Sequence, residues 1–326
     1  LVTSAIPEAF GGYGEERSAV TGAIALEELA YGDLSLALHA LAPRLLVYPV
    51  IDHGTEEQKK RVLPAFAGSD FRPAGAAVIE PFLDFDLTSL RTTFRKDGGD
   101  FVLSGRKAYV PLAAASDTLL VYARAAEANG NGDPIAAAKN VQAFLVDRGT
   151  RGLGIGQPEK NMGIKALATH EVELQDVRVP AEAKLGGESG IDFARLTNLS
   201  RVALGALAVG VARAAFDYAR DYAKERKAFG VAIAQKQAIA FMLAEMAIEI
   251  DATRLLVWEA AWKLDRREEA TREAYLAKNY AANVVLKVCD DAVQVLGGHG
   301  YIRDHLVELF LRNARGFAAF EGLAIV

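Results

Sequence analysis

Cysteine and histidine are scarce in this chain of 326 residues, and their scarcity excludes several kinds of site. The single cysteine, Cys289, cannot form an intrachain disulfide. Together with five scattered histidines it offers no paired spacing for a zinc cluster, so we expect no metal centre. A basic surplus is also missing, because 37 Lys and Arg face 42 Asp and Glu, for a net charge of −5. This balance disfavours a general nucleic-acid-binding protein.

Long uncharged apolar stretches are absent as well. No run of 18 such residues occurs, so we predict no transmembrane helix. Residues 1–13 carry no basic segment of the kind that begins a signal peptide, which predicts a soluble protein of a reducing compartment, the cytoplasm. The hydrophobic fraction is 51%, enough for a large core, and the length corresponds to two or three domains at roughly 150 residues each.

The apolar pattern divides the chain into three parts. Residues 1–71 are predicted to be helical, with periodic apolar positions in Ala19–Tyr31 and Ser35–Ile51 and a capping-box pattern at Thr55–Gln58. Residues 184–326 show helical periodicity in four segments separated by short breaks, which predicts an antiparallel four-helix bundle. The four segments are Phe193–Arg226, Gln235–Leu264, Arg267–Leu296 and Val307–Ala319.

Residues 72–183 are rich in Val, Thr, Phe and Gly and are predicted to form antiparallel β-structure. Asp97-Gly98-Gly99-Asp100 is a hairpin turn signal, and the alternation in Glu171–Val177 predicts a half-buried strand that ends in a small bulge. Glu127–Asn140 is predicted to be a long surface loop. The fold class is therefore α+β, with N-terminal helices, a central antiparallel β-domain and a C-terminal four-helix bundle.

Three glycine-containing segments are candidates for ligand binding. Gly152–Gly156 lacks the G-x-G-x-x-G spacing of a dinucleotide fingerprint, which favours a turn there. Gln294–Tyr301 is either a helix C-cap or a loop whose backbone approaches a ligand closely. Arg226–Gly230 is either a solvated basic helix end or an arginine for pyrophosphate beside an aromatic ring.

Individual residues within the helical parts also carry predictions. Glu321 lies in an apolar stretch, where burial would disfavour its charged form and suit it to general-base catalysis; the alternative is plain exposure. Glu27 and Glu28 are expected on a solvated face. Gly205 and Gly210 interrupt a long helical pattern, which predicts close backbone packing there.

Several segments, taken in order, match the pattern of one known family. They are Ile6–Gly12, Glu27–Ala30, Gln58–Pro64, Glu80-Pro81, Leu103–Lys107, Met162–Ile164, Asp176–Pro180, Glu225–Gly230, Gln237–Met246 and Gln294–Tyr301. Over nearly its whole length the chain thus resembles the acyl-CoA dehydrogenase family. The resemblance implies a helix–barrel–bundle fold, FAD as cofactor, an acyl-CoA substrate, an electron-transferring flavoprotein as partner, and a homo-oligomer (a dimer or a tetramer of two dimers).

The chemistry implied by the resemblance is α,β-dehydrogenation of an acyl-CoA thioester, in which a glutamate removes the α-proton and flavin N5 accepts the β-hydride. The implied base is Glu321, in the turn that it forms with the next two residues, and Arg201 belongs to the same catalytic site. The other base position known in the family is Ser200 here, which is not a carboxylate. The implied cofactor-binding residues are Arg226, Phe229, Gln237, Gln294 and Gly298, toward the FAD of a partner subunit, and Tyr109 and Pro111, toward the flavin ring.

The resemblance breaks on the flavin side. The family's T-E-P-G-A-G-S-D is Ile79–Asp86 here, its K-x-W-I-T-N is Lys107–Leu112, and the threonine after E-G is Leu323. Polar flavin contacts are thereby replaced by Ile79, Phe85, Pro111 and Leu323, a loss of about 2–6 kcal/mol unless other contacts substitute. Such a loss weakens FAD binding by roughly one to four powers of ten.

Three hypotheses are compatible with these residues. The first is an FAD-dependent acyl-CoA dehydrogenase. The second is a flavin-poor or non-catalytic subunit that binds CoA esters or pairs with an active relative. The third is a flavin monooxygenase of the same fold, which needs no glutamate base. Family members usually have further residues before Ile6 and a helical segment after Glu321, so we expect the N-terminal helical domain of this chain to be truncated.

Overall fold

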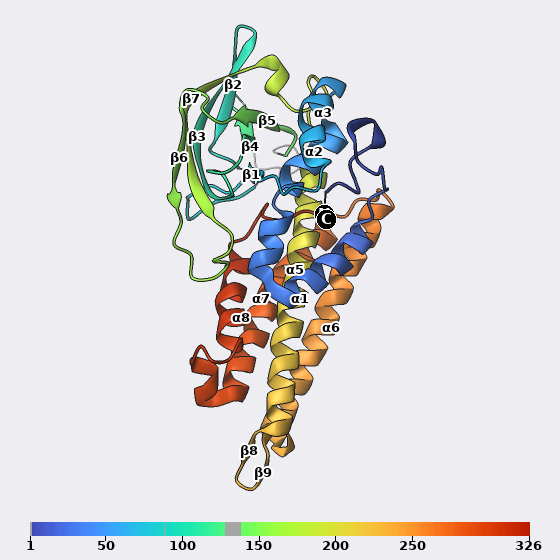
Figure 1. Cartoon of the computed structure of the whole chain (residues 1–326), viewed down its shortest axis with the longest axis vertical. Helices are drawn as coiled ribbons and strands as arrows, with labels where there is room; N and C mark the ends of the chain where they lie inside the picture. The colour runs from blue at the N-terminus through green and yellow to red at the C-terminus, as the bar shows by residue number, and fades with distance from the viewer. Residues whose placement is uncertain (1, 88, 128–137) are drawn as a thin grey trace.

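A computed structural model describes residues 2–87, 89–127 and 138–326 of the chain. Its long axis follows three helices, and a curved sheet occupies one end beside the N-terminal helices (Figure 1). Most of the predicted loop Glu127–Asn140 lies outside the described residues.

The N-terminal part is helical, as predicted. It contains α1 (Ala19–Leu41), α2 (Arg44–His53) and α3 (Glu56–Val62). Thr55 and Gln58 form the predicted capping box at the start of α3. The side-chain amide of Gln58 also donates to the carbonyl oxygens of Glu182 and Lys184, at 2.8 Å each. This contact connects α3 to the segment that follows the sheet.

The central part is a seven-stranded sheet with the strand order β1-β4-β2-β3-β7-β6 and β5 paired to β4. The strands are β1 (Gly75–Ala77), β2 (Thr93–Asp97), β3 (Asp100–Pro111), β4 (Thr118–Ala125), β5 (Val141–Asp147), β6 (Leu153–Pro158) and β7 (Thr169–Pro180). The predicted hairpin is confirmed, with Asp97 opposite Asp100. The bulge in β7 is also confirmed, since the pairing with β3 shifts register and Asp176 has a φ of 48°.

The prediction of a purely antiparallel sheet is wrong in two pairings. β4 pairs in parallel with β1 and with β2 along one of its edges, and antiparallel with β5 along the other. The cause is the connection after β3. The chain leaves the β2–β3 hairpin and returns along the free edge of β2, so that β4 runs in the same direction as β2.

The C-terminal part contains the four predicted helices in the predicted order. They are α5 (Phe193–Glu225), α6 (Gln237–Asp265), α7 (Thr271–Leu296) and α8 (Val307–Ala314), the last followed by the 3₁₀ turn η6 (Arg315–Ala318). A small hairpin of β8 (Lys227–Ala228) and β9 (Val231–Ala232) joins α5 to α6, and the 3₁₀ turn η5 (Gly297–Tyr301) follows α7. Among the described helices, α5 is long and apolar enough to cross a membrane, as is the pair α1 and α2 taken together across a 57° bend. However, 83% of the most apolar window of α5 is buried within the protein, as in a core helix.

The two glycines of α5 lie where other helices approach closely, as predicted. A Cβ on Gly210 would lie 2.2 Å from the backbone oxygen of Glu27 in α1, and one on Gly205 would lie 2.8 Å from Cγ2 of Val257 in α6. Since real Cβ contacts are never this short, a side chain at Gly210 would push α1 and α5 apart.

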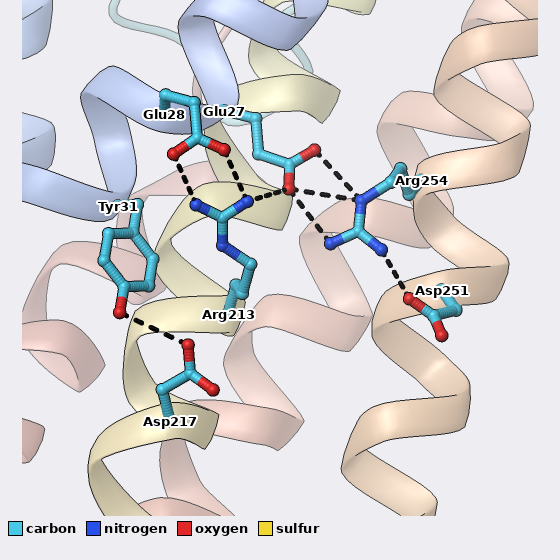
Figure 2. Close-up of polar contacts among 7 residues, drawn as sticks. All are labelled: Glu27, Glu28, Tyr31, Arg213, Asp217, Asp251 and Arg254. Atoms are coloured by element: carbon cyan, nitrogen blue, oxygen red, sulfur yellow. Dashed lines mark hydrogen bonds and ion pairs between the residues drawn. The ribbon is translucent and has the colours of Figure 1, made fainter.

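The expectation that Glu27 is solvated is wrong. Glu27 is 5% exposed, and its carboxylate lies between two arginines from different helices (Figure 2). Arg213 of α5 donates to Oε1 at 2.8 Å, and Arg254 of α6 donates to both oxygens at 2.9–3.1 Å. The neighbouring Glu28 remains exposed and forms a bidentate pair with Arg213. The carboxylate of Glu27 is buried because these arginines replace its hydration and so connect α1, α5 and α6.

Candidate functional site

Glu321 lies in an irregular segment directly after η6, and its position is fixed by its neighbours in the chain. The ring of Phe320 packs against Phe317, with centroids 5.6 Å apart. Gly322 has a φ of 62°, in the left-handed region, and a Cβ there would lie 2.7 Å from Val78. Glycine is therefore required at this turn for two reasons, and the turn brings the glutamate against the sheet and the bundle.

The Glu321 carboxylate lies between two cations contributed by two helices. Oε1 is 3.0 Å from Nζ of Lys278 in α7, and Oε2 is 3.9 Å from Nε of Arg201 in α5. All three side chains are mostly buried, with 16%, 8% and 14% of Glu321, Lys278 and Arg201 exposed. The guanidinium of Arg201 also lies over the ring of Tyr275, at 5.2 Å. The carboxylate is thus ion-paired rather than isolated in apolar surroundings.

Unsatisfied polar atoms converge on this carboxylate. Five buried side-chain polar atoms of the described residues lack a hydrogen-bond partner, and three of them are Oγ of Ser200, Nε of Arg201 and Oε2 of Glu321. Buried polar atoms are normally hydrogen-bonded, so a cluster of exceptions calls for an explanation. A water molecule or a polar group of a ligand between these three residues would satisfy them.

A cavity of about 30 Å³ reaches Glu321 and Ser200, which gives room for a water molecule. Its walls come from all three parts of the chain and are mainly apolar. They include Leu45 and Pro49 of α2, Val78 beside β1, Leu87 after it, and Phe193 and Leu196 of α5. Glu321, whose carboxylate has one oxygen without a hydrogen bond, therefore lines a small, mainly apolar space at the junction of the three parts.

The segment beside Val78 is held by a buried ion pair. Nζ of Lys107 in β3 is 3.0 Å from Oε1 of Glu80 and donates to the carbonyl oxygen of Val78 at 3.0 Å. The Glu80 carboxylate also accepts the backbone N–H groups of Arg91 and Thr92. Burial lowers the pKa of Lys107 to about 8, although Glu80 acts in the opposite direction. This network fixes the Ile79–Phe85 segment on the edge of the sheet.

The residues predicted to face the flavin ring lie next to this network. The backbone N–H of Ala108 donates to the carbonyl oxygen of Ile79 at 2.9 Å, which sets Ile79 beside Tyr109. Tyr109 has a φ of 52°, and its backbone N–H donates to Oε1 of Glu159 at 3.2 Å. Pro111 is buried where β3 ends. Ile79 and Leu323 are buried too, at 6% and 2% exposure, so apolar side chains are buried at positions where the resemblance expects hydroxyl groups.

The hairpin of β8 and β9, which contains or adjoins several residues predicted to contact the far end of FAD, forms the tip of the bundle away from the sheet (Figure 1). Tyr222 of α5 and His299 of η5 are 2.7 Å apart at Oη and Nδ1, which brings the end of α5 beside the end of α7. The predicted residues at these ends are all exposed: Arg226, Phe229, Gln237, Gln294 and Gly298. Phe229 is 96% exposed, and nothing lies within 4 Å of a Cβ placed on Gly298.

The predicted cofactor-binding residues therefore form two separate groups, one near Tyr109 and Pro111 and one near Arg226 and Gly298. Arg201 and Arg226 are 25 positions apart on and just after α5, which corresponds to about 37 Å. One dinucleotide does not span that distance along a single chain. The exposed group fits a phosphate and an adenine, because Arg226 has no ion-pair partner among the described residues and the ring of Phe229 is almost wholly exposed, with Nζ of Lys236 5.7 Å from its centroid. The group around Pro111 fits a flavin ring through apolar contact. FAD thus fits the residues if two copies of the chain each supply one group.

Lys278 is the site residue that sequence analysis missed. It lies on the buried face of α7 with Ala274, Ala277 and Ala281. Lys278 is the single charged residue among the buried residues of that helix. A lysine on an otherwise apolar helix face is a signal for a buried carboxylate partner, since an unpaired buried ammonium group is costly. The sequence does not show that this partner is Glu321, 43 positions later.

Comparisons with known proteins find one family along the whole chain. Models of the acyl-CoA dehydrogenase N-terminal, middle and C-terminal domains match residues 1–70, 75–177 and 189–324. Among solved structures, that of butyryl-CoA dehydrogenase from Megasphaera elsdenii is 31% identical with a TM-score of 0.84, over 99% of this chain and 83% of that one.

Curated relatives are similar over almost the whole chain. The "Caffeyl-CoA reductase-Etf complex subunit CarC" of Acetobacterium woodii is 35% identical, over 98% of this chain and 83% of the relative. The "Cyclohex-1-ene-1-carbonyl-CoA dehydrogenase" of Geobacter metallireducens is 35% identical, over 99% and 83%.

Proposed function

The chain belongs to the acyl-CoA dehydrogenase family, whose members are FAD-dependent oxidoreductases, and we propose that it dehydrogenates an acyl-CoA thioester with Glu321 as the base. The predicted FAD cofactor is that of the family. When bound, FAD supplies the acceptor for the hydride that leaves Cβ with its electron pair. Loss of the Cα proton and the Cβ hydride leaves a double bond between the two carbons.

The observation that carries the proposal is the free oxygen of Glu321. Oε2 is buried and makes no hydrogen bond, and it belongs to a carboxylate that borders the apolar cavity. A general base needs such an oxygen within reach of the proton that it removes. The apolar walls exclude bulk water from the carboxylate, which prevents water from competing with the substrate for the base.

Arg201 has a second role in the proposal. Its Nε has no hydrogen-bond partner and lies 3.9 Å from Oε2 of Glu321. A guanidinium so placed stabilises the carboxylate before the reaction, and its free N–H is available to a polar group of the substrate. Ser200, one residue earlier on α5, offers a hydroxyl to the same space.

Partners follow from the relatives and from the two groups of cofactor residues. The relative in Acetobacterium woodii is a subunit of a reductase–Etf complex, which supports an electron-transferring flavoprotein as redox partner. The separation of Arg226 from Arg201, which lies beside Glu321, supports a homo-oligomer, a dimer or a tetramer, in which a second copy completes the FAD site. A role in fatty acid metabolism and a cytoplasmic location stay predictions.

The test is Glu321→Gln, which keeps the shape of the side chain but removes its basicity. We expect exchange of the α-protons of an acyl-CoA with D₂O, followed by NMR, to fall by about 10²–10⁴-fold, the usual contribution of a general base. Butyryl-, octanoyl- and cyclohexanecarbonyl-CoA, each of which carries an α-proton, serve as probes. FAD content should not change. The control is Glu171→Gln, an exposed carboxylate of β7, and unchanged exchange in Glu321→Gln would refute the assignment.

A second candidate function rests on the apolar replacements at Ile79, Phe85, Pro111 and Leu323. It is a flavin-poor subunit that binds CoA esters without oxidising them. An absorption spectrum of the purified protein distinguishes the two. A flavin band that bleaches with an acyl-CoA under argon supports the dehydrogenase, whereas no band even after incubation with excess FAD supports the subunit.

A further inference from the structure

Lys278 is buried although the packing of the bundle does not require a lysine at this position. Its side chain is 8% exposed, and the surrounding positions of α7 are filled by alanines that pack against the bundle. An uncharged residue would satisfy the packing there at no electrostatic cost. Its ion pair with Glu321 is its one ion pair in the described part of the chain. The residue is therefore best understood through what it does to Glu321.

The Glu321 side chain has little else to hold it. It projects from an irregular segment, and Gly322 behind it has a left-handed conformation. Among the described residues the second cation paired with the carboxylate is Arg201, whose Nε lies at 3.9 Å and makes no hydrogen bond, and the hydroxyls of Thr197 and Ser200 belong to residues that line the same cavity. The contact at 3.0 Å between Lys278 and Oε1 is thus the short polar contact that fixes the carboxylate's orientation.

We propose that Lys278 is a positioning residue that holds Glu321 by Oε1 and leaves Oε2 as the atom that accepts the proton. This inference rests on the proposed function, since it concerns the same carboxylate. Two otherwise equivalent oxygens become different: one is occupied by an ammonium group from α7, and the other is buried without a hydrogen bond, in a residue that lines the cavity. Lys278 itself does not line the cavity and acts through Glu321.

The experiment compares Lys278→Met, Lys278→Gln and Lys278→Arg in the FAD-loaded enzyme. The readouts are the rate of flavin bleaching by the fastest of the three acyl-CoA probes, the Kd of that probe, and α-proton exchange. We expect Lys278→Met to lower the bleaching and exchange rates by about 10²-fold, the usual cost of a misplaced catalytic group. FAD content and probe Kd should change by less than about threefold. Lys278→Arg should recover most of the rate, and Lys278→Gln, which keeps a donor for Oε1, should be intermediate.

The control is Lys287→Met on the same helix. Lys287 is half-exposed and pairs with Asp291 one turn later, so the same substitution removes an ion pair that does not touch the site. We expect wild-type rates. If Lys278→Met does not fold, the comparison of Gln with Arg carries the test, because both keep a hydrogen-bond donor and differ in charge.

Two failures are distinguishable. If Glu321→Gln retains α-proton exchange, the proposed function fails whatever Lys278 does. If Glu321→Gln is inactive while Lys278→Met keeps the wild-type rates, or weakens probe binding with the rate unchanged, the function stands and the positioning role is refuted. Equal losses of rate in Lys278→Met and Lys278→Arg would also refute the positioning role. That result would show that keeping the positive charge at this position does not help the reaction.

Discussion

Glu27 is buried and Glu321 is mostly buried, at 6% and 16% side-chain exposure, and the two glutamates differ above all in their hydrogen bonds. Each lies between a cation of α5 and a cation of another bundle helix. For Glu27 these are Arg213 and Arg254, and for Glu321 they are Arg201 and Lys278. Around Glu27 both carboxylate oxygens accept hydrogen bonds of 2.8–3.1 Å (Figure 2). At Glu321 one oxygen has a cation at 3.0 Å and the other has no hydrogen bond.

The difference shows how to tell a structural ion pair from a functional one in the same bundle. Satisfying every acceptor of Glu27 compensates for its burial and leaves nothing for a ligand. A buried Oε2 of Glu321 without a hydrogen bond destabilises the ligand-free protein. Such an unsatisfied atom is retained in a binding site because a bound group can form the missing hydrogen bond. Both sites hold one carboxylate and two neighbouring cations, so the hydrogen-bond count separates them more sharply than charge does.

Glu27→Ala tests the structural half of this comparison and should have the largest effect on stability. Removing one partner of a buried ion pair usually costs roughly 3–5 kcal/mol. We expect the lower end, because Arg213 and Arg254 are about a fifth exposed and keep Glu28 and Asp251 as partners. Denaturant unfolding of the FAD-loaded protein measures the change. An unchanged free energy of unfolding would show that the network does not hold the three helices together.

Gly210→Ala sharpens the comparison by moving Glu27 without changing its charge. The new Cβ would lie 2.2 Å from the backbone oxygen of Glu27, so α1 and α5 must separate. Overpacking of this kind costs about 1–3 kcal/mol. Gly32→Ala in α1 is the matched control, because nothing lies within 4 Å of its added Cβ. Gly32 directly precedes Asp33, where the backbone of α1 is non-helical, so we expect that control to change the free energy of unfolding by less than about 0.5 kcal/mol. Thermal unfolding of both variants decides, and equal midpoints would contradict the close approach.

How far sequence alone reaches depends on the range of the interaction. Helical periodicity and capping are local, and they predicted the four C-terminal helices and the capping box at Thr55. The hairpin at Gly98 and the bulge near Asp176 are equally local. Glu321 was also predicted as a candidate, because its apolar flanks and the glycine after it are neighbours in the chain.

Interactions between distant segments were not predicted. Glu27 was expected in solvent because its partners lie 186 and 227 positions away, and nothing near Glu27 reveals them. Lys278 was missed for the same reason. The parallel pairings of β4 depend on the route of the chain after β3, which a pattern of single strands does not contain. The incorrect or missing predictions thus concern charged residues and strands whose partners are determined by tertiary packing.

Glu28→Gln is the smallest change, and it tests whether exposure alone separates Glu28 from its buried neighbour. A hydrogen bond from Arg213 lowers the pKa of Glu28 below its usual 4.5, slight burial opposes this, and the charges of Arg213 and Arg254 add to it. A lowered pKa in the folded state stabilises the protein above pH 4.5, and that contribution is lost as the pH falls through the folded-state pKa. The side chain is 60% exposed, so we expect at most about 1 kcal/mol at pH 7. Unfolding at pH 7 and pH 3, with and without 1 M salt, measures it. A loss as large as that of Glu27→Ala, or one that persists at pH 3, would show that the two glutamates form one unit rather than a buried group and an exposed one.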